Sequence, residues 1–137
     1  MSEKQNTVPT ILVVEPDDDV RPLLKNNLHG KGYRVIMTLD EEDAITRARG
    51  DGDCPDLILI NQYRLPLYKV IHIGRRIRQD AGLHGTTPIV IMAEGYGEDM
   101  EGKDVKVGES DYVTYLEDGD QLTNLLQRLC PIQKSNG

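Results

Sequence analysis

Short runs of apolar residues alternate along the chain with longer segments in which apolar residues recur three or four positions apart. The short runs have the length of β-strands and lie at 11–14, 35–38, 57–60, 89–93 and 112–115. Several are apolar at every position, as expected of strands that are buried on both faces of a sheet. The pattern therefore predicts a parallel sheet in the interior of the protein.

The segments between these runs predict amphipathic helices, because their apolar residues fall on one helical face. The apolar sets are Val20, Leu23, Leu24 and Leu28; Ala44, Ile45 and Ala48; Val70, Ile73, Gly74 and Ile77; and Leu122, Leu125, Leu126 and Leu129. Asp40 is the expected N-cap of the second helix. Strand and helix alternate five times, which favours an α/β fold with helices on both faces of the sheet. The pattern alone leaves the strand order open.

The segment 94–111 is the weakest helix candidate. It contains four glycines and only three apolar anchors, Met100, Val105 and Val107, and glycine disfavours helices. We expect a short or irregular fourth helix there. Around a single domain at 11–130 we predict a flexible N-terminal segment at 1–10 and a C-terminal tail at 131–137, with no second domain.

Composition and charge narrow the classes of function. Of 137 residues, 38% are hydrophobic and 28% are charged, which is typical of a soluble globular domain. The net charge of -7 disfavours nucleic acid as a partner, and the one dense basic group, Arg75, Arg76 and Arg78, is expected to form a solvated helix face. Two cysteines and no membrane-length apolar stretch predict a cytoplasmic protein without a membrane partner.

Five motifs, taken together, resemble those of response-regulator receiver domains. They are ILVVEPDDDVRPLL, PDLILINQYRLP, RRIR, PIVIMAE and GESDYV, and they follow one another in the family's order over about 11–129. The resemblance implies a flavodoxin-like, five-stranded parallel sheet with the strand order 2-1-3-4-5. Ligands of open α/β sheets bind at the carboxyl ends of the strands, and four of the motifs supply residues there.

In the family that these motifs resemble, an aspartate at the end of the third strand accepts a phosphoryl group. A magnesium ion is held there by that aspartate and by acids after the first strand. Here the acceptor position falls on Asn61 when counted from Pro55, or on Gln62 when counted back from Pro66. Neither residue is a carboxylate. A neutral amide is a poor nucleophile toward phosphorus and supplies no anionic oxygen for magnesium.

Other positions of the family's site are also replaced. Glu15 remains from the acidic pair, but Pro16 stands at the place of the direct metal ligand and has no side-chain oxygen. Ala93 replaces the hydroxyl residue after the fourth strand. Tyr115 replaces the lysine after the fifth strand and brings no positive charge at neutral pH. The resemblance therefore implies a receiver whose phosphorylation chemistry is lost.

Three consecutive acids, Asp17, Asp18 and Asp19, could supply replacement ligands for magnesium beside Glu15. Acids at the start of a helix also cap free N–H groups and suit the positive end of the helix dipole, and we favour that interpretation. We predict no metal, no cofactor and no catalytic residue.

The leading hypothesis is a phosphorylation-independent pseudo-receiver that binds a signalling protein or a second copy of itself in a two-component or phosphorelay pathway. Output is expected through the surface of the domain itself. The resemblance places the interaction face, and a possible homodimer, on the fourth helix, fifth strand and fifth helix, with Tyr112 as an anchor. One alternative is a divergent active receiver that is phosphorylated with magnesium on another acid, such as Asp17. Another is a flavodoxin-like binder of a small ligand, although acidic residues after the first strand would repel a phosphate.

Overall fold

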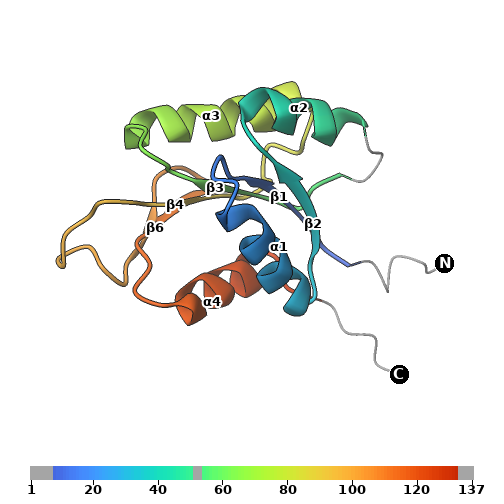
Figure 1. The fold of residues 1–137 in the computed structure, drawn as a ribbon. Coiled ribbons are helices and arrows are strands. Elements are labelled where there is room, and N and C mark those ends of the chain that lie inside the picture. Colours follow the sequence, from blue (N-terminus) through green and yellow to red (C-terminus); the bar gives the residue numbers. More distant parts are fainter. Residues whose placement is uncertain (1–7, 51–53, 133–137) are drawn as a thin grey trace.

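The structure is a computed structural model that describes residues 8–50 and 54–132. A mostly parallel sheet lies between two layers of helices (Figure 1). One face of the sheet is covered by α2 (Glu41–Gly50) and α3 (Leu67–Asp80), and the other by α1 (Val20–Gly30) and α4 (Gly119–Leu129). The predicted α/β class with helices on both faces is confirmed.

The sheet contains six strands in the order β2-β1-β3-β4-β6-β5. The parallel strands are β1 (Thr10–Val14), β2 (Arg34–Thr38), β3 (Leu57–Asn61), β4 (Ile89–Met92) and β6 (Asp111–Thr114). The outer strand β5 (Asp104–Lys106) pairs antiparallel with β6. The predicted number of five strands was therefore wrong, because β5 is a sixth strand at the edge of the sheet. The five parallel strands follow one another in the predicted order 2-1-3-4-5. The missed strand has three residues, and only Val105 among them is apolar, so it produces no strand pattern.

The expected fourth helix does not form between β4 and β6, both of which lie in the described part of the chain. The segment 94–103 consists of loop and turns instead. Gly95 and Gly102 adopt φ of +64° and +89°, a backbone conformation that ends helices and builds turns. The chain then returns to the sheet as β5. The predicted interaction face therefore lacks the helix that was expected between β4 and β6 in this described segment.

Two apolar clusters fill the space between the sheet and its helices. Alternate strand residues point to opposite faces, so Ile58 and Ile60 face α2 and α3, whereas Leu57 and Leu59 face α1 and α4. All four side chains are at most 2% exposed, which confirms that this strand is buried on both faces. α3 approaches the sheet closely at Gly74, where an added Cβ would lie 2.9 Å from the Ile89 side chain.

The second helix begins as the sequence predicts. The Asp40 carboxylate accepts a hydrogen bond from the backbone N–H of Asp43 (2.9 Å), and the Asp43 carboxylate accepts one from the N–H of Leu39 (3.0 Å). The first bond satisfies a backbone donor that the first turn of a helix leaves free, and the second ties the residue before the cap to that turn. The prediction of Asp40 as an N-cap is confirmed.

The three arginines of α3 do not form a free basic face. Arg75 Nε and Arg78 Nη1 each lie 2.8 Å from the Asp111 carboxylate, whose side chain is 4% exposed, and Arg76 pairs with three acids on α2 and α3. The expectation of a solvated face was therefore wrong for Arg78, whose side chain is 16% exposed, whereas Arg75 and Arg76 remain exposed. The turn beside them requires Gly108, because an added Cβ would lie 2.4 Å from Asp111 Oδ2. The ion pairs hold β6 against α3.

Several other predictions concern the chain as a whole. Cys54 and Cys130 are free thiols, as expected. Among the helices of residues 8–50 and 54–132, none has the length and apolar character that a membrane span requires. The cytoplasmic location stays a prediction. Most of the predicted flexible segments at 1–10 and 131–137 lies outside the described residues, and the domain boundaries also stay a prediction.

Candidate functional site

Glu15 lies directly after β1 and is fully buried. Its backbone N–H donates to the carbonyl of Thr38 (3.0 Å), which continues the pairing of β1 with β2. Its own carbonyl accepts a hydrogen bond from Arg21 Nη1 (2.9 Å), a residue in the first turn of α1. Strand pairing and the helix together fix the position of this acid at the carboxyl edge of the sheet.

The Asn61 side chain, at the end of β3, faces the Glu15 carboxylate. Its amide nitrogen lies 2.8 Å from Oε1 and 3.0 Å from Oε2. The backbone N–H of Asp17 donates to the same carboxylate (3.2 Å). A buried carboxylate is costly unless hydrogen bonds replace those it made with water, and here an amide and a backbone group supply them. The result is a closed pair of one acid and one amide.

The Gln62 side chain turns away from Glu15. Its Nε2 donates to the carbonyl of Leu65 (2.8 Å), and its Oε1 accepts from the backbone N–H of Glu94 (2.7 Å). The Glu94 carboxylate in turn accepts from the backbone N–H of Arg64 (2.8 Å). Gln62 therefore joins the loops after β3 and β4 and does not contribute to the acid and amide pair.

The loop after β3 contains two consecutive residues in the left-handed backbone region. Tyr63 and Arg64 have φ of +41° and +67°, which is unfavourable for residues with a Cβ. The N–H of Tyr63 donates to Asn61 Oδ1 (3.3 Å), so the strained loop is hydrogen-bonded to the same side chain that faces Glu15. The sequence alone contains no signal for these backbone angles.

Pro16, Ala93 and Tyr115 complete the set of predicted site residues. Pro16 is exposed, and Ala93 is half-buried with its backbone N–H bonded to the carbonyl of Thr114 (3.0 Å). The Tyr115 ring packs edge-on against Tyr96, with ring centres 5.3 Å apart, and both Ala93 and Tyr115 contact the apolar cluster under α2 and α3. None of the three side chains brings a cation or an aliphatic hydroxyl to the edge of the sheet.

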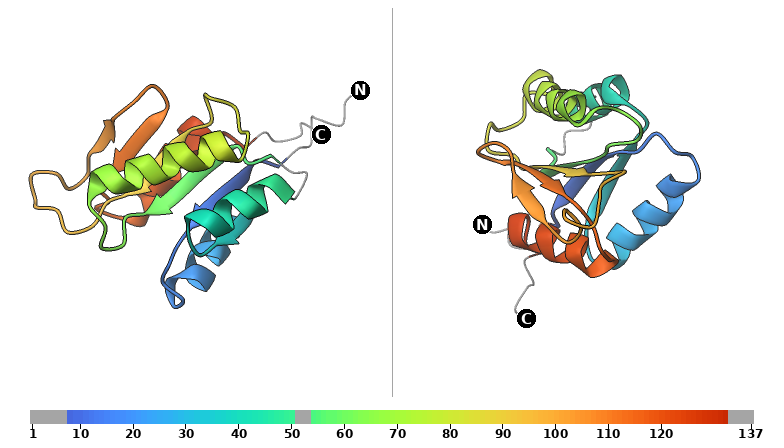
Figure 2. Two further views of the ribbon diagram at one scale, coloured as in Figure 1. Left: turned by 90° about the horizontal axis from the view of Figure 1, so that it is seen from above. Right: turned by 90° about the vertical axis from the view of Figure 1, so that its left-hand side faces the viewer.

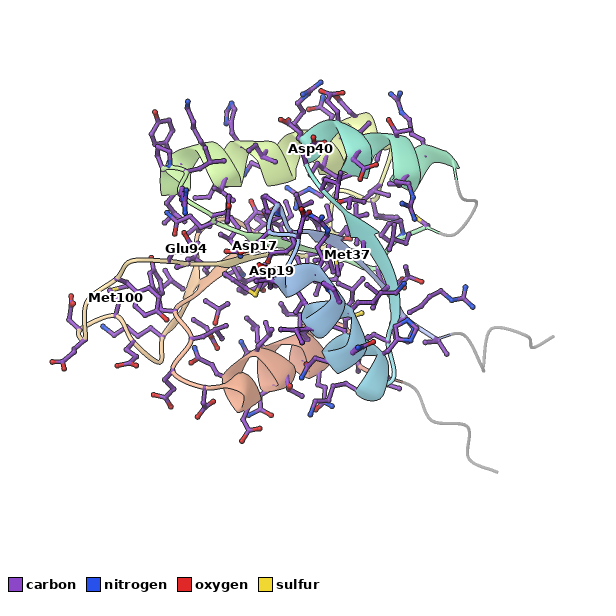
Figure 3. The ribbon with its side chains drawn as sticks, in the orientation of Figure 1. Asp17, Asp19, Met37, Asp40, Glu94 and Met100 are labelled. Atoms are coloured by element: carbon purple, nitrogen blue, oxygen red, sulfur yellow. The ribbon has the colours of Figure 1, made fainter. Side chains whose placement is uncertain are left out.

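Asp17 and Asp19 mark the start of α1, with Glu94 on a neighbouring loop and Met100 farther out in the segment 94–103 (Figure 3). The Asp17 carboxylate accepts from the backbone N–H of Asp19 (2.9 Å), and Asp18 pairs with Arg21. Within residues 8–50 and 54–132, no group of three or more His, Cys, Asp or Glu side chains is arranged to hold a metal ion.

Tyr112 is half-buried and packs into the apolar cluster beneath α1 and α4. Nearby lies a polar network that sequence analysis missed. Thr114 is fully buried, and its hydroxyl donates to Asp104 Oδ1 (2.7 Å), which also accepts from Gln121 Nε2 (2.9 Å). A threonine in an otherwise apolar strand was the available signal, because a buried hydroxyl needs a partner.

The sequence is similar to curated transcriptional regulatory proteins. YxdJ of Bacillus subtilis is 31% identical over 106 residues, which are 75% of this chain and 42% of YxdJ. The alkaline phosphatase synthesis regulator PhoP of the same organism is 31% identical over 104 residues, which are 76% of this chain and 41% of PhoP. The chain thus spans less than half the length of either relative. No protein-family profile matches it.

Solved receiver structures have the same architecture. The CheY-like response regulator receiver domain from Methylobacillus flagellatus gives a TM-score of 0.66 at 20% identity, with 90% of this chain and 99% of that chain covered. The fold is that of a CheY-like receiver domain. The receiver domain of the sensor histidine kinase PA1611 from Pseudomonas aeruginosa, whose structure holds magnesium in its active site cleft, gives 0.59 at 22% identity, with coverage of 90% and 98%.

Sequence relatives and structural neighbours together support a response-regulator receiver domain. In this chain, which has the receiver fold, the residue that ends β3 is Asn61, and the acid after β1 is Glu15. The structure brings these two predicted site residues into contact. It directs Gln62 to a different set of partners.

Proposed function

We propose that this receiver domain acts in two-component or phosphorelay signalling as a protein-interaction module that is not phosphorylated. One observation carries the proposal. The side chain at the end of β3 is the amide of Asn61, and it already donates to both carboxylate oxygens of buried Glu15. An amide that is engaged in this way offers neither a nucleophilic oxygen for phosphorus nor an anionic ligand for a cation.

In this proposal Asn61 occupies the place of the phosphoacceptor, because it faces Glu15 whereas Gln62 is bonded to Leu65 and Glu94. A magnesium ion at Glu15 would have to displace the amide of Asn61. The neighbouring position, Pro16, has no side-chain oxygen to compensate. The Asn61 amide therefore already occupies the carboxylate oxygens that a bound cation would need.

The other two replacements support the same conclusion. A phosphoryl group on the acceptor needs hydrogen-bond donors and positive charge around its oxygens. Ala93 supplies a methyl group, and the Tyr115 ring is packed against Tyr96 and the core. A phosphorylated state would therefore lack the contacts that make such a group stable in a protein pocket.

The first test is incubation of the purified chain with acetyl phosphate and magnesium, followed by intact mass. We expect no change in mass, and no shift of melting temperature with millimolar magnesium alone. A stoichiometric gain of one phosphoryl group would overturn the proposal. If that group mapped to Asp17, whose carboxylate accepts the N–H of Asp19 at the same edge, the divergent active receiver would replace it.

Two substitutions test the position of the acceptor. We expect Asn61→Asp to remain unphosphorylated, because it gains neither the ligand missing at Pro16 nor the cation missing at Tyr115. Gln62→Asp is the matched control, since it places an acid one residue further along the same loop. Phosphorylation of Asn61→Asp would show that the other replacements matter little, and phosphorylation of Gln62→Asp alone would show that the acceptor position was misassigned.

The interaction surface that we propose consists of the β5–β6 hairpin and α4. It replaces the predicted face, which included a helix between β4 and β6. Tyr112 packs against the α4 cluster from β6, so part of its ring supports the fold. We keep Tyr112 as a proposed contact residue of this surface. Tyr112→Ala is expected to lower both the melting temperature and the affinity for a partner, and a fall in melting temperature alone would remove it from the surface.

A further inference from the structure

The strand β5 forms an edge of the sheet, with β6 on one side and, among residues 8–50 and 54–132, no strand on the other. Residues of an antiparallel pair alternate in the direction of their backbone groups. The carbonyl of Lys103 and the N–H of Val107 bond to β6, at Tyr115 (2.8 Å) and Asp111 (2.8 Å). The N–H and carbonyl groups of the intervening even-numbered residues therefore point to the free edge.

The residues that present these groups are Asp104 and Lys106, and both are exposed. α3 lies above the hairpin and α4 below it, and neither helix covers the outer strand (Figure 2). An uncovered edge of this kind is a template for pairing with another strand. Which strand it fits depends on the side chains that alternate along it.

We propose that β5 pairs antiparallel with β5 of a second copy of this chain, in the register that sets Val105 opposite its own equivalent. In that register Asp104 lies opposite Lys106 of the second copy, and Lys106 lies opposite Asp104 of the second copy. Each such pair exchanges two backbone hydrogen bonds and brings opposite charges together on one face of the joined sheet.

The neighbouring symmetric registers are unfavourable. A pairing centred on Asp104 would set two aspartates opposite each other, and one centred on Lys106 would set two lysines opposite each other. Like charges at directly opposed positions destabilise a strand pair. The pattern Asp-Val-Lys is therefore self-complementary in one symmetric register, which is the reason that a second copy is the occupant we infer.

The Asp104 side chain on this edge is also pre-ordered. Asp104 Oδ1 accepts hydrogen bonds from Thr114 Oγ1 (2.7 Å) and Gln121 Nε2 (2.9 Å), while Lys106 lies next to Tyr112 in the β5–β6 pairing. An ordered side chain loses less entropy when it meets a partner. Because each strand has only three residues, the contact is smaller than a stable dimer interface, and we expect weak, concentration-dependent association.

This inference rests on the proposed interaction function but not on the chemistry of Asn61. Sedimentation velocity from micromolar to millimolar protein at low salt is the primary measurement. We expect self-association that weakens as salt screens the paired charges. Lys106→Glu and Asp104→Lys should each weaken it at least tenfold. An equimolar mixture of the two variants should associate again, because each then meets opposite charges on the other.

Lys25→Glu on α1 is the matched control, with the same change of charge away from the edge. Asp104→Lys removes the contacts to Thr114 and Gln121, so its fold is checked by circular dichroism. If Asp104→Lys does not fold, Asp104→Asn takes its place in the mixture, because it keeps the acceptor oxygen. Asp104→Asn mixed with Lys106→Glu should then associate more strongly than Lys106→Glu alone. Equal association of Lys106→Glu and Lys25→Glu, or no recovery on mixing, would refute the pairing.

Amide hydrogen exchange by NMR gives an independent readout of the register. Exchange at Asp104 and Lys106 should slow as protein concentration rises, whereas Val105, whose N–H faces β6, should not change. Unchanged exchange at all three amides at millimolar concentration would overturn the proposal. The acetyl phosphate experiment tests whether the domain is phosphorylated, which is a separate question. Either the strand pairing or the absence of phosphorylation can therefore be refuted without affecting the other.

Discussion

The inner strands of the sheet and its outer hairpin are stabilised in different ways. In β3 every residue from Leu57 to Ile60 is at most 2% exposed, and both faces contact apolar side chains. In β6 the buried groups include Asp111, paired with two arginines, and Thr114, bonded to Asp104. Apolar burial forms the inner region, whereas polar contacts between distant residues position the outer one.

The inner region should be the more sensitive to loss of a buried side chain. Ile58 is fully buried between β1 and β4, so Ile58→Ala leaves a cavity and should cost about 4 kcal/mol of unfolding free energy. Urea denaturation followed by circular dichroism measures it. Leu23→Ala is the control, since Leu23 is 71% exposed, and it should change stability by no more than about 0.5 kcal/mol. An equal loss of unfolding free energy in Ile58→Ala and Leu23→Ala would contradict the view that apolar burial stabilises the inner strands.

The outer hairpin should depend on one carboxylate. Asp111→Ala leaves Arg75 and Arg78 without their buried partner and should cost about 3 kcal/mol. This is the lower end of the range for buried pairs, because Arg75 is 45% exposed. Hydrogen exchange should increase in β5 and β6 more than in β3. Asp80→Ala breaks the exposed pair with Arg76 and should cost under about 1 kcal/mol. Uniform exchange across the sheet would show that the hairpin is not a separate unit.

Asn61→Asp tests the one polar contact at the carboxyl edge of β3. Two carboxylates would then face each other in a buried site, which raises the pKa of one of them. A raised folded-state pKa means that stability is retained at pH below about 4 and is lost as pH rises through the raised value. We expect a deficit of about 2 kcal/mol at pH 7 that disappears near pH 4. Gln62→Glu, which does not face Glu15, should show no such recovery.

The smallest expected effect on stability is at alkaline pH and concerns Tyr33, which is buried just before β2. Burial and then the nearby Cys130 thiolate raise the pKa of Tyr33 to about 12, and the buried hydroxyl donates to the Cys130 carbonyl (3.0 Å). Because the folded state holds this proton more tightly, stability should fall between about pH 10 and pH 12, by roughly 1 kcal/mol at pH 11. Tyr33→Phe should remove that part of the slope, measured by chemical denaturation across the range.

Sequence analysis predicted the inner region well because burial on both faces leaves a continuous apolar pattern. The runs at 11–14 and 57–60 became β1 and β3 with a shift of one residue at most. The pattern failed at 94–111, where the glycines argued against a regular helix but gave no sign of β5. A strand of three residues with two charged side chains carries no periodicity, and its position depends on Thr114 and Gln121, which lie later in the chain.

The candidate site shows the same limit. The sequence identified Glu15 and Asn61 as residues at the edge of the sheet, since both follow buried strands. It left Asn61 and Gln62 as alternatives, because one residue of register cannot be read from a loop. The direction of each side chain distinguishes them, and it is fixed by hydrogen bonds to Glu15 in one case and to Leu65 and Glu94 in the other.

The position of β6 between β4 and β5 has a consequence for the order of folding. Asp111 is 22 residues from its parallel partner Ile89, whereas Thr114 is only 10 residues from its antiparallel partner Asp104. Local hairpins close faster than parallel pairings, which need a long loop to close first. We expect β6 to form with β5 before it docks on β4, so that conservative substitutions in this hairpin slow folding more than they speed unfolding. Stopped-flow kinetics of Val113→Ala would test this. An effect on the unfolding rate alone would mean that the hairpin forms late in folding.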